Sequence, residues 1–206
     1  MTETGVGARV ARTEDKRFLT GRGRYTDDIS LPRQTYAYFV RSPHAHATID
    51  RIDVSAAANA PGVVAVFTGE DVKQDGIGGL ICGWMIHSKD GSPMNAGPHP
   101  VLADGKVRYV GDHVAMVVAE SLDQAQAAAD LVEVSYGTLP AIVDTATTQS
   151  PGAPQVHDAA PNNTVYEWAI GEKSAVDEAF AGADHVTKLD IVNNRLIPNA
   201  IEPRAA

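Results

Sequence analysis

The sequence predicts an α/β (α+β) fold, in which short strands and short helices follow one another along the chain. The clearest signal is HVAMVVAE at 113–120, LDQAQAAADL at 122–131 and LVEVSY at 131–136. An apolar run, an alanine-rich stretch and a β-branched run are typical of strand, helix and strand. TYAYFVR at 35–41 and HATIDRIDV at 46–54 are rich in aromatic and β-branched residues, so they predict two further strands.

Short helices are predicted where a capping residue follows a strand. VVAVFT at 63–68 predicts a strand, and Thr68 and Asp71 then stand at capping-box spacing before a brief helix. Ser55 is expected to open a helical turn that Pro61 ends.

The stretch 113–136 predicts a βαβ unit. Ser121 and Gln124 form a capping box for the alanine-rich helix. Strand, helix and strand in so short a stretch favour a right-handed crossover that joins two parallel strands.

Loops and linkers divide the chain into an N-terminal arm at 1–34, a central domain at 35–145, a polar, proline-rich linker at 146–162 and a last part at 163–206. In the last part, TVYEWAIG, SAVDEAFAGA and DHVTKLDIV predict strand, helix and strand again. Within the central domain, Gly and Pro residues at 73–100 predict a long irregular loop, which is functional, a partner contact or partly disordered. ADGK, after this loop, predicts an Asp-Gly turn between short strands.

Composition excludes several classes of protein. Hydrophobic residues make up 44% and charged residues 21%, enough for an ordinary core. A single cysteine, Cys82, allows no intrachain disulfide, and no apolar run approaches the roughly 20 residues of a membrane helix. No signal-peptide core opens the chain, so we expect a cytoplasmic protein without membrane contact. The net charge is −9, and residues after 41 carry nine basic against 21 acidic groups, so we expect no nucleic-acid binding.

Asp112 and His113 are adjacent at the mouth of the apolar strand and raise the question of an acid/base pair. In a strand, neighbouring side chains point to opposite faces, which keeps them from forming a dyad. A local turn would relax that objection. The simpler interpretation is structural, because a general base needs hydrogen-bonding geometry that a strand does not give.

A metal site is the second hypothesis. His44 and His46 stand two residues apart, an acceptable spacing for ligands on one strand face. Further ligands would have to come from the irregular loop, where Cys82, His87 and His99 lack CxxC or HExxH spacing. A bound metal is therefore not expected. Cys82 has no sequence mark of a nucleophile and is interpreted as a loop or core thiol.

Glycine motifs give no nucleotide fingerprint. GRGRY at 21–25 and GIGG at 76–79 do not open a helix after a strand, and neither GxxxxGK[ST] nor GxSxG occurs. The arginine-rich arm at 1–34 fits two interpretations, phosphate binding or packing on an acidic partner or on the acidic body of the chain, and the second is favoured. We predict no catalytic, cofactor-binding or metal-ligating residue in this chain from motifs alone.

Four stretches occur in a fixed order along the chain: RTEDKRFLTGRGRYTDDI at 12–29, VRSPHAHATI at 40–49, GVVAVFTGED at 62–71 and VRYVGDHVAMVVAESLDQAQAAADLVEVSYGTLPAIVD at 107–144. Together they resemble the start of the large subunit of the molybdenum hydroxylases, a family with xanthine dehydrogenase, aldehyde oxidase and aerobic carbon monoxide dehydrogenase. The resemblance implies that 35–145 is an α/β hammerhead domain. It also implies that 163–206, with NNRLIPNAIEPRAA, is the truncated beginning of a molybdopterin-binding domain.

Two departures from the family bear on function. The family commonly has Gly-Asp-Pro where this chain has Gly111, Asp112 and His113, which favours a structural role for the pair. The family's molybdopterin-binding loops and catalytic glutamate lie beyond the point that matches Ala206. Glu202 stands in a different motif, IEPRAA, and is not taken for that glutamate.

The resemblance implies a complete enzyme that hydroxylates a substrate with oxygen from water. It implies molybdenum with molybdopterin cytosine dinucleotide, [2Fe–2S] clusters and FAD, and as partners the remainder of the large subunit, an iron–sulfur subunit and an FAD subunit. Two interpretations remain open. The chain is either the N-terminal scaffold of such a subunit, inactive alone, or a self-standing hammerhead module that acts as a binding or assembly protein.

Overall fold

The computed structural model describes residues 5–8, 12–193, 196–200 and 202. The chain forms two compact units, one of residues 35–186 and one that joins 1–34 to 187–206. No helix among the described residues is long and apolar enough to cross a membrane.

The first sheet of the larger unit holds β1 (Tyr36–Arg41), β5 (His113–Ala119) and β3 (Val63–Thr68), with β5 in the centre. Both pairings are antiparallel. The central position explains the nearly continuous apolar sequence of β5, because a strand covered on both faces needs apolar residues on each of them.

The second sheet holds β4 (Lys106–Val107), β2 (Ala47–Asp53) and β6 (Glu133–Thr138), again with antiparallel pairings only. The predicted parallel βαβ crossover is therefore wrong. Strand, helix and strand do follow one another from β5 to β6, but the two strands belong to different sheets. The helix links two sheets, and each strand finds its partner elsewhere in the chain.

Three helices lie among these strands: α2 (Ser55–Ala58), α3 (Gly69–Gln74) and α4 (Leu122–Ala129). The caps predicted for α3 and α4 are confirmed. The carboxylate of Asp71 accepts the backbone N–H and the hydroxyl of Thr68, both at 2.7 Å, and these hydrogen bonds lower the pKa of Asp71.

The hydroxyl oxygen of Ser121 accepts the backbone N–H of Gln124 at 3.3 Å and so caps α4. The start of α2 differs from the prediction by one residue, since its N-cap is Val54 and Ser55 is already helical. The carboxylate of Asp53 accepts the backbone N–H of Ser55 at 3.0 Å and also its hydroxyl, so it supplies the oxygen that Val54 lacks.

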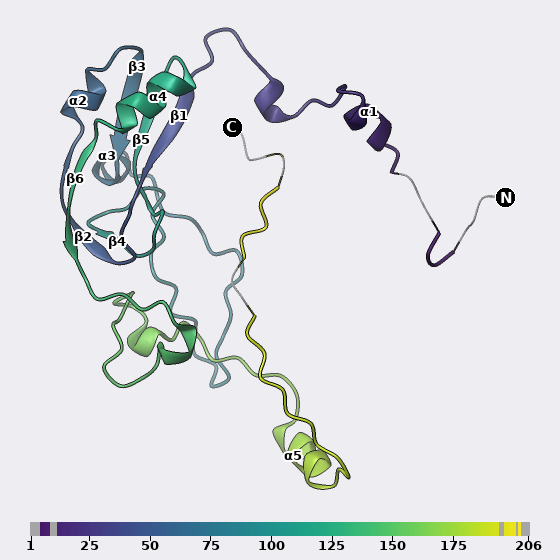
Figure 1. Cartoon of the computed structure of the whole chain (residues 1–206). Coiled ribbons are helices and arrows are strands. Elements are labelled where there is room, and N and C mark those ends of the chain that lie inside the picture. Colours follow the sequence, from purple (N-terminus) through teal and green to yellow (C-terminus); the bar gives the residue numbers. More distant parts are fainter. Residues whose placement is uncertain (1–4, 9–11, 194–195, 201, 203–206) are drawn as a thin grey trace. The chain divides into compact units, whose positions relative to one another are not determined.

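Helices cover one face of the first sheet. α4 contacts β1, β5 and β3, and α2 packs on β3 and α4 (Figure 1). The alanines of α4 allow this close approach, because Ala128 and Ala129 are buried against Val117 of β5 and Tyr38 of β1. A second core cluster, around Ala47, Ala103, Val107 and Val114, packs against Ile49, Ile52, Val134 and Tyr136 of the second sheet. The opposite face of the first sheet is not covered by α2 or α4. α3 and the loop after it lie over this face, which holds the candidate site.

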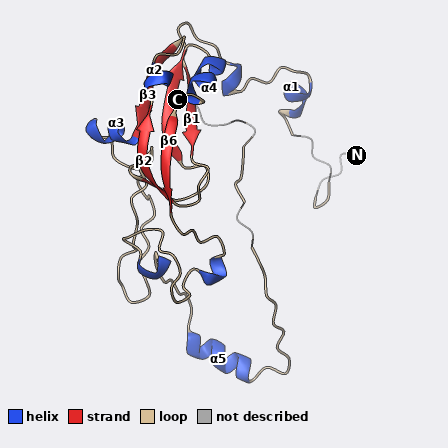
Figure 2. Cartoon of the chain, turned by 60° about the vertical axis from the view of Figure 1, so that its left-hand side comes forward, coloured by secondary structure: helices blue, strands red, loops and turns tan. Residues whose placement is uncertain are grey.

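The segment after the sheets is less regular than predicted. α5 (Lys173–Ala181) confirms the helix expected in SAVDEAFAGA. The strands predicted in TVYEWAIG and DHVTKLDIV are not formed, since Figure 2 and the assignment show loop on both sides of α5. Residues 194–195, 201 and 203–206 of the predicted molybdopterin-binding start lie outside the described residues.

The smaller unit contains α1 (Asp15–Leu19) and a 3₁₀ turn at Thr26–Asp28. The rings of Phe18 and Tyr25 stack with centroids 5.7 Å apart. Gly23 permits this arrangement, because a Cβ there would lie 2.6 Å from a ring carbon of Phe18. Part of the arm predicted at 1–34, from Phe18 to Tyr25, is thus locally folded around an aromatic pair.

Candidate functional site

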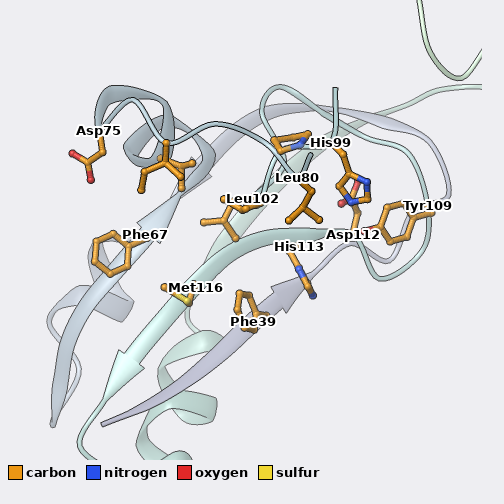
Figure 3. A pocket seen from close by; sticks show the side chains of 14 residues that line it. Phe39, Phe67, Asp75, Leu80, His99, Leu102, Tyr109, Asp112, His113 and Met116 are labelled. Carbon is orange, nitrogen blue, oxygen red and sulfur yellow. The ribbon is translucent and has the colours of Figure 1, made fainter. Parts of the chain in front are cut away.

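The face of the first sheet opposite α2 and α4 borders a cavity of about 650 Å³ (Figure 3). The floor is a row of three large apolar side chains, one from each strand. Phe39 of β1 and Phe67 of β3 both stand opposite Met116 of β5 in the strand register. Because side chains alternate across a sheet, the next residues along, such as Val117, point to the helix-covered face.

The roof of the cavity comes from α3 and from the loop that follows it. Val72 belongs to α3 and Asp75 is its C-cap. Ile77, Leu80 and Leu102 belong to the chain between α3 and β4. The backbone N–H of Leu80 donates to the carbonyl of His99 at 2.8 Å, which holds the two ends of the long loop together. The loop predicted at 73–100 therefore has a definite place over the sheet.

Four polar side chains line one end of the cavity: His99, Tyr109, Asp112 and His113. Asp112 precedes β5 and ends a turn in which its backbone N–H donates to the carbonyl of Tyr109 at 3.2 Å. The carboxylate of Asp112 accepts the backbone N–H of Arg108 at 3.1 Å. Gly111, between them, has a φ of 92°, a conformation that favours glycine. Asp112 thus stabilises the turn that precedes β5.

No hydrogen bond joins Asp112 to His113 in the part of the chain that the structure describes. The imidazole of His113 stacks on Phe39 with ring centroids 4.6 Å apart, and its Nε2 is buried without a hydrogen-bond partner. Burial lowers the pKa of His113, and the charge of Arg41 lowers it further. His113 is thus a packed imidazole in the cavity wall, and its burial favours the neutral form.

Tyr109 completes the polar end. Burial raises the pKa of its phenol, and the neighbouring charge of Asp112 raises it further, so Tyr109 remains protonated at neutral pH. Apolar walls with two imidazoles, a phenol and one carboxylate at one end are typical of a binding cavity. The contacts of Asp112 and His113 favour that interpretation over a proton-transfer pair, which would need a hydrogen bond between them.

The histidines of the metal hypothesis are not arranged as ligands. His44 and His46 precede β2 and do not share a strand face. The ring of His44 meets Tyr136 edge-on, with centroids 4.8 Å apart. His46 is 6% exposed, and its Nδ1 lies 2.8 Å from the carbonyl oxygen of Pro140. Each histidine is held by packing against β6 or the chain after it.

The three loop candidates are also dispersed. Cys82 is exposed, and its Sγ lies 3.2 Å from the carbonyl oxygen of Trp84. His87 forms an isolated bridge with Pro93, and His99 lines the cavity. Among residues 5–8, 12–193, 196–200 and 202, no three His, Cys, Asp or Glu side chains are placed to hold a metal ion.

His157 is a partly buried residue that sequence analysis did not single out. Burial lowers the pKa of its imidazole, and the charge of Arg108 acts in the same direction. It lies against Gly97, where a Cβ would be 2.5 Å from its Nδ1. His157 stands in a polar, proline-rich stretch without periodicity, so only the folded chain reveals this contact.

Glu202 lies in the smaller unit. One oxygen of its carboxylate accepts the backbone N–H of Thr26 at 3.0 Å. This contact joins the two segments of that unit.

Two antiparallel sheets, the first with α2 and α4 on one face and an apolar cavity on the other, define the larger unit as an α/β domain. Residues 20–140 match the family model described as aldehyde oxidase and xanthine dehydrogenase, a/b hammerhead domain. The chain belongs to this family of molybdenum hydroxylase large subunits, and the matched residues are its hammerhead domain.

Several characterised relatives are similar over most of the chain. The carbon monoxide dehydrogenase large chain of Afipia carboxidovorans is 38% identical over 96% of this chain and 25% of its own length. The nicotine 6-hydroxylase large subunit of Paenarthrobacter nicotinovorans is 40% identical over 90% of this chain and 22% of its own. The chain thus spans about a quarter of the length of these relatives.

A solved structure of reconstituted CO dehydrogenase from Oligotropha carboxidovorans has a TM-score of 0.69 and 36% identity. The match covers 88% of this chain and 23% of that one. The similarity therefore reaches well beyond the hammerhead domain within this chain.

Proposed function

We propose that this chain is the N-terminal scaffold of a molybdenum hydroxylase large subunit and takes part in catalysis only with the rest of that subunit. In this role the hammerhead domain supports the catalytic part and presents surfaces to it. The active complex would oxidise its substrate by hydroxylation with oxygen from water. The substrate would be selected by polypeptide other than these residues.

The observation that carries the proposal is the exposure of the segment from 165 to 186. Every side chain in this stretch is exposed, including Trp168, Ile170 and Phe180. α5 buries none of its residues, although Val176 and Phe180 stand one turn apart on its surface. A segment so rich in large apolar groups is stabilised when another polypeptide covers it. In relatives about four times as long, further polypeptide is at hand for this purpose.

The cofactors and partners of the complex follow from the same proposal. Molybdenum with molybdopterin cytosine dinucleotide would supply the oxidation chemistry when bound in the rest of the large subunit. The [2Fe–2S] clusters and FAD would lie on an iron–sulfur subunit and an FAD subunit. Among the described residues, no three His, Cys, Asp or Glu side chains are placed to hold a metal ion. We propose that the catalytic and ligating residues belong to the rest of the complex.

A complementation experiment tests the proposal. The 206-residue chain is co-expressed with the Afipia carboxidovorans large chain from which the matching first quarter has been removed, together with that enzyme's other subunits. We expect electron-acceptor activity in the combination and none with either piece alone. Turnover by the isolated chain would contradict the proposal. The relative's own first quarter, supplied as a separate chain, is the positive control.

The cavity beneath Leu80 and Leu102 favours a second candidate function, a self-standing binding module. Its volume of about 650 Å³ is within the range of small-molecule sites. Under this candidate, the pure chain would gain thermal stability from a small apolar ligand, and His113→Leu would alter the ligand's affinity. No stabilisation across a library of such ligands would argue against it.

A further inference from the structure

The two tryptophans of the chain, Trp84 and Trp168, lie on one face of the larger unit, 84 positions apart in sequence. They border a shallow hollow of about 570 Å³. We call this surface the tryptophan face and define it by the residues that line the hollow: Trp84, Met85, Ile86, His87, Tyr166 and Trp168. Trp84 is 79% exposed and Trp168 is 62% exposed.

The tryptophan face is held in place by hydrogen bonds between two distant loops. The backbone N–H groups of Lys89 and Asn95 donate to the carbonyls of Glu167 and Val165, each at 2.7 Å. The backbone N–H of Glu167 donates to the hydroxyl of Ser88 at 3.2 Å. The loop predicted at 73–100 is therefore anchored to the segment at 164–168, and the exposed rings stand on a fixed base.

The chemistry of the tryptophan face is that of an interface core. None of its six residues carries a carboxylate, ammonium or guanidinium group, and the nearby charges of Lys89 and Glu167 are paired at 2.7 Å. Tryptophan, tyrosine and methionine are enriched at the centres of protein interfaces, whereas lysine and the acidic residues are depleted there. A large apolar patch on a fixed base thus fits a protein partner.

We propose that the tryptophan face binds the polypeptide that completes the large subunit, an inference that rests on the proposed function. The length of the relatives identifies this occupant. The match to the carbon monoxide dehydrogenase large chain includes 96% of this chain but only 25% of the relative. The match therefore leaves three quarters of the relative's polypeptide outside the part that corresponds to this chain. That further polypeptide is available to cover the segments around Trp84 and Trp168. A partner of that size can cover a hollow built from two separate loops.

The experiment uses the complementation pair described above. Trp84→Ser and Trp168→Ser are combined in one variant, and Val64→Thr is the matched control, since Val64 is 61% exposed on the edge strand β3. Loss of two anchor residues should weaken co-purification by at least about tenfold. The control should pair as the unaltered chain does. Circular dichroism checks that each variant is folded.

A second readout needs no mutation. Oxidation of Trp84 and Trp168 by N-bromosuccinimide, followed by mass spectrometry, measures the accessibility of each ring. We expect both rings to react quickly in the free chain and at least about tenfold more slowly in the complex, because a ring in an interface core is shielded from solvent.

The outcomes separate this inference from the proposed function. If the chains pair and become active while both rings stay reactive, the inference is wrong and the proposed function stands. If the unaltered chain fails to pair where the positive control succeeds, both are contradicted. If the free chain self-associates at micromolar concentration with both rings protected, a second copy occupies the face and the inference is overturned.

Discussion

The imidazole of His113 stacks on the ring of Phe39, with centroids 4.6 Å apart and planes inclined by 28°. The pair joins the start of β5 to the end of β1 and forms part of the cavity wall. His113 is therefore packed as an aromatic residue, with its Nε2 buried. This packing should therefore affect the stability of the fold, and the pH dependence of that stability, more than the activity of the complex.

The lowered pKa of His113 predicts a stability that depends on pH. Burial disfavours the charged imidazole, so the unfolded chain, with a histidine pKa of about 6.5, binds more protons than the folded chain. Stability from this group is present above the unfolded pKa and is lost as pH falls through the lower folded pKa. His157 acts in the same direction. Urea midpoints should fall from pH 7.5 to pH 5.5.

His113→Phe tests the source of that dependence. Phenylalanine keeps the stacking on Phe39 and removes the titrating group, so the decline in urea midpoint between pH 7.5 and 5.5 should become shallower. His157→Phe in the same background should reduce it further. An unchanged slope in the first variant would show that His113 does not titrate with folding.

Substitution of Asp112 or His113 should leave the activity of the complemented enzyme largely intact. Asp112→Asn keeps an oxygen that can accept the N–H of Arg108, and His113→Pro places proline at the first residue of a strand, where it is tolerated. We expect the complemented enzyme to retain activity within about tenfold in both variants, since general acid–base groups contribute more than that. A loss of activity of about a thousandfold in a variant that still folds would instead identify an acid/base role.

The cap of α4 should matter for stability because this helix covers the first sheet. Ser121→Ala removes the oxygen that accepts the N–H of Gln124, and we expect a loss of about 1 kcal/mol in the free energy of unfolding. Gln126→Ala, at an exposed position of the same helix, is the control and should change it by less than about 0.5 kcal/mol. Equal effects would mean that the cap is not formed in solution.

Gly69 should tolerate no side chain. It is the first residue of α3, and a Cβ there would overlap the backbone carbonyl of Ala103, which has little room to move. Gly69→Ala should cost about 1–3 kcal/mol, as overpacking does. Gly83→Ala is the matched control, because no atom lies within 4 Å of its Cβ position. A neutral Gly69→Ala would contradict the close approach of α3 to the chain before β4.

Most local elements could be predicted from the sequence because each has its own signal. The β-branched runs of β1, β2 and β3, the apolar run of β5, the capping box of α3 and the Ser121 cap of α4 are all confirmed. Strand pairing could not be predicted in the same way. β5 and β6 follow one another through α4, yet each pairs with strands that lie earlier in the chain. The order of the strands along the sequence does not by itself determine which strands pair.

The cavity was also beyond sequence analysis. Its floor unites Phe39, Phe67 and Met116, and only the register of three strands brings these residues together. Asp112 and His113 were singled out, but their roles depend on Arg108 and Phe39. The strands predicted on either side of α5 failed for a related reason, because an apolar alternation forms a strand only where a pairing partner is present.

The molybdenum content of the purified 206-residue chain, compared with that of the complemented complex, tests the central claim most directly. The account predicts molybdenum close to one atom per complex when the companion polypeptide is present, and a background amount in the isolated chain. Stoichiometric molybdenum retained by the isolated chain after gel filtration would contradict it.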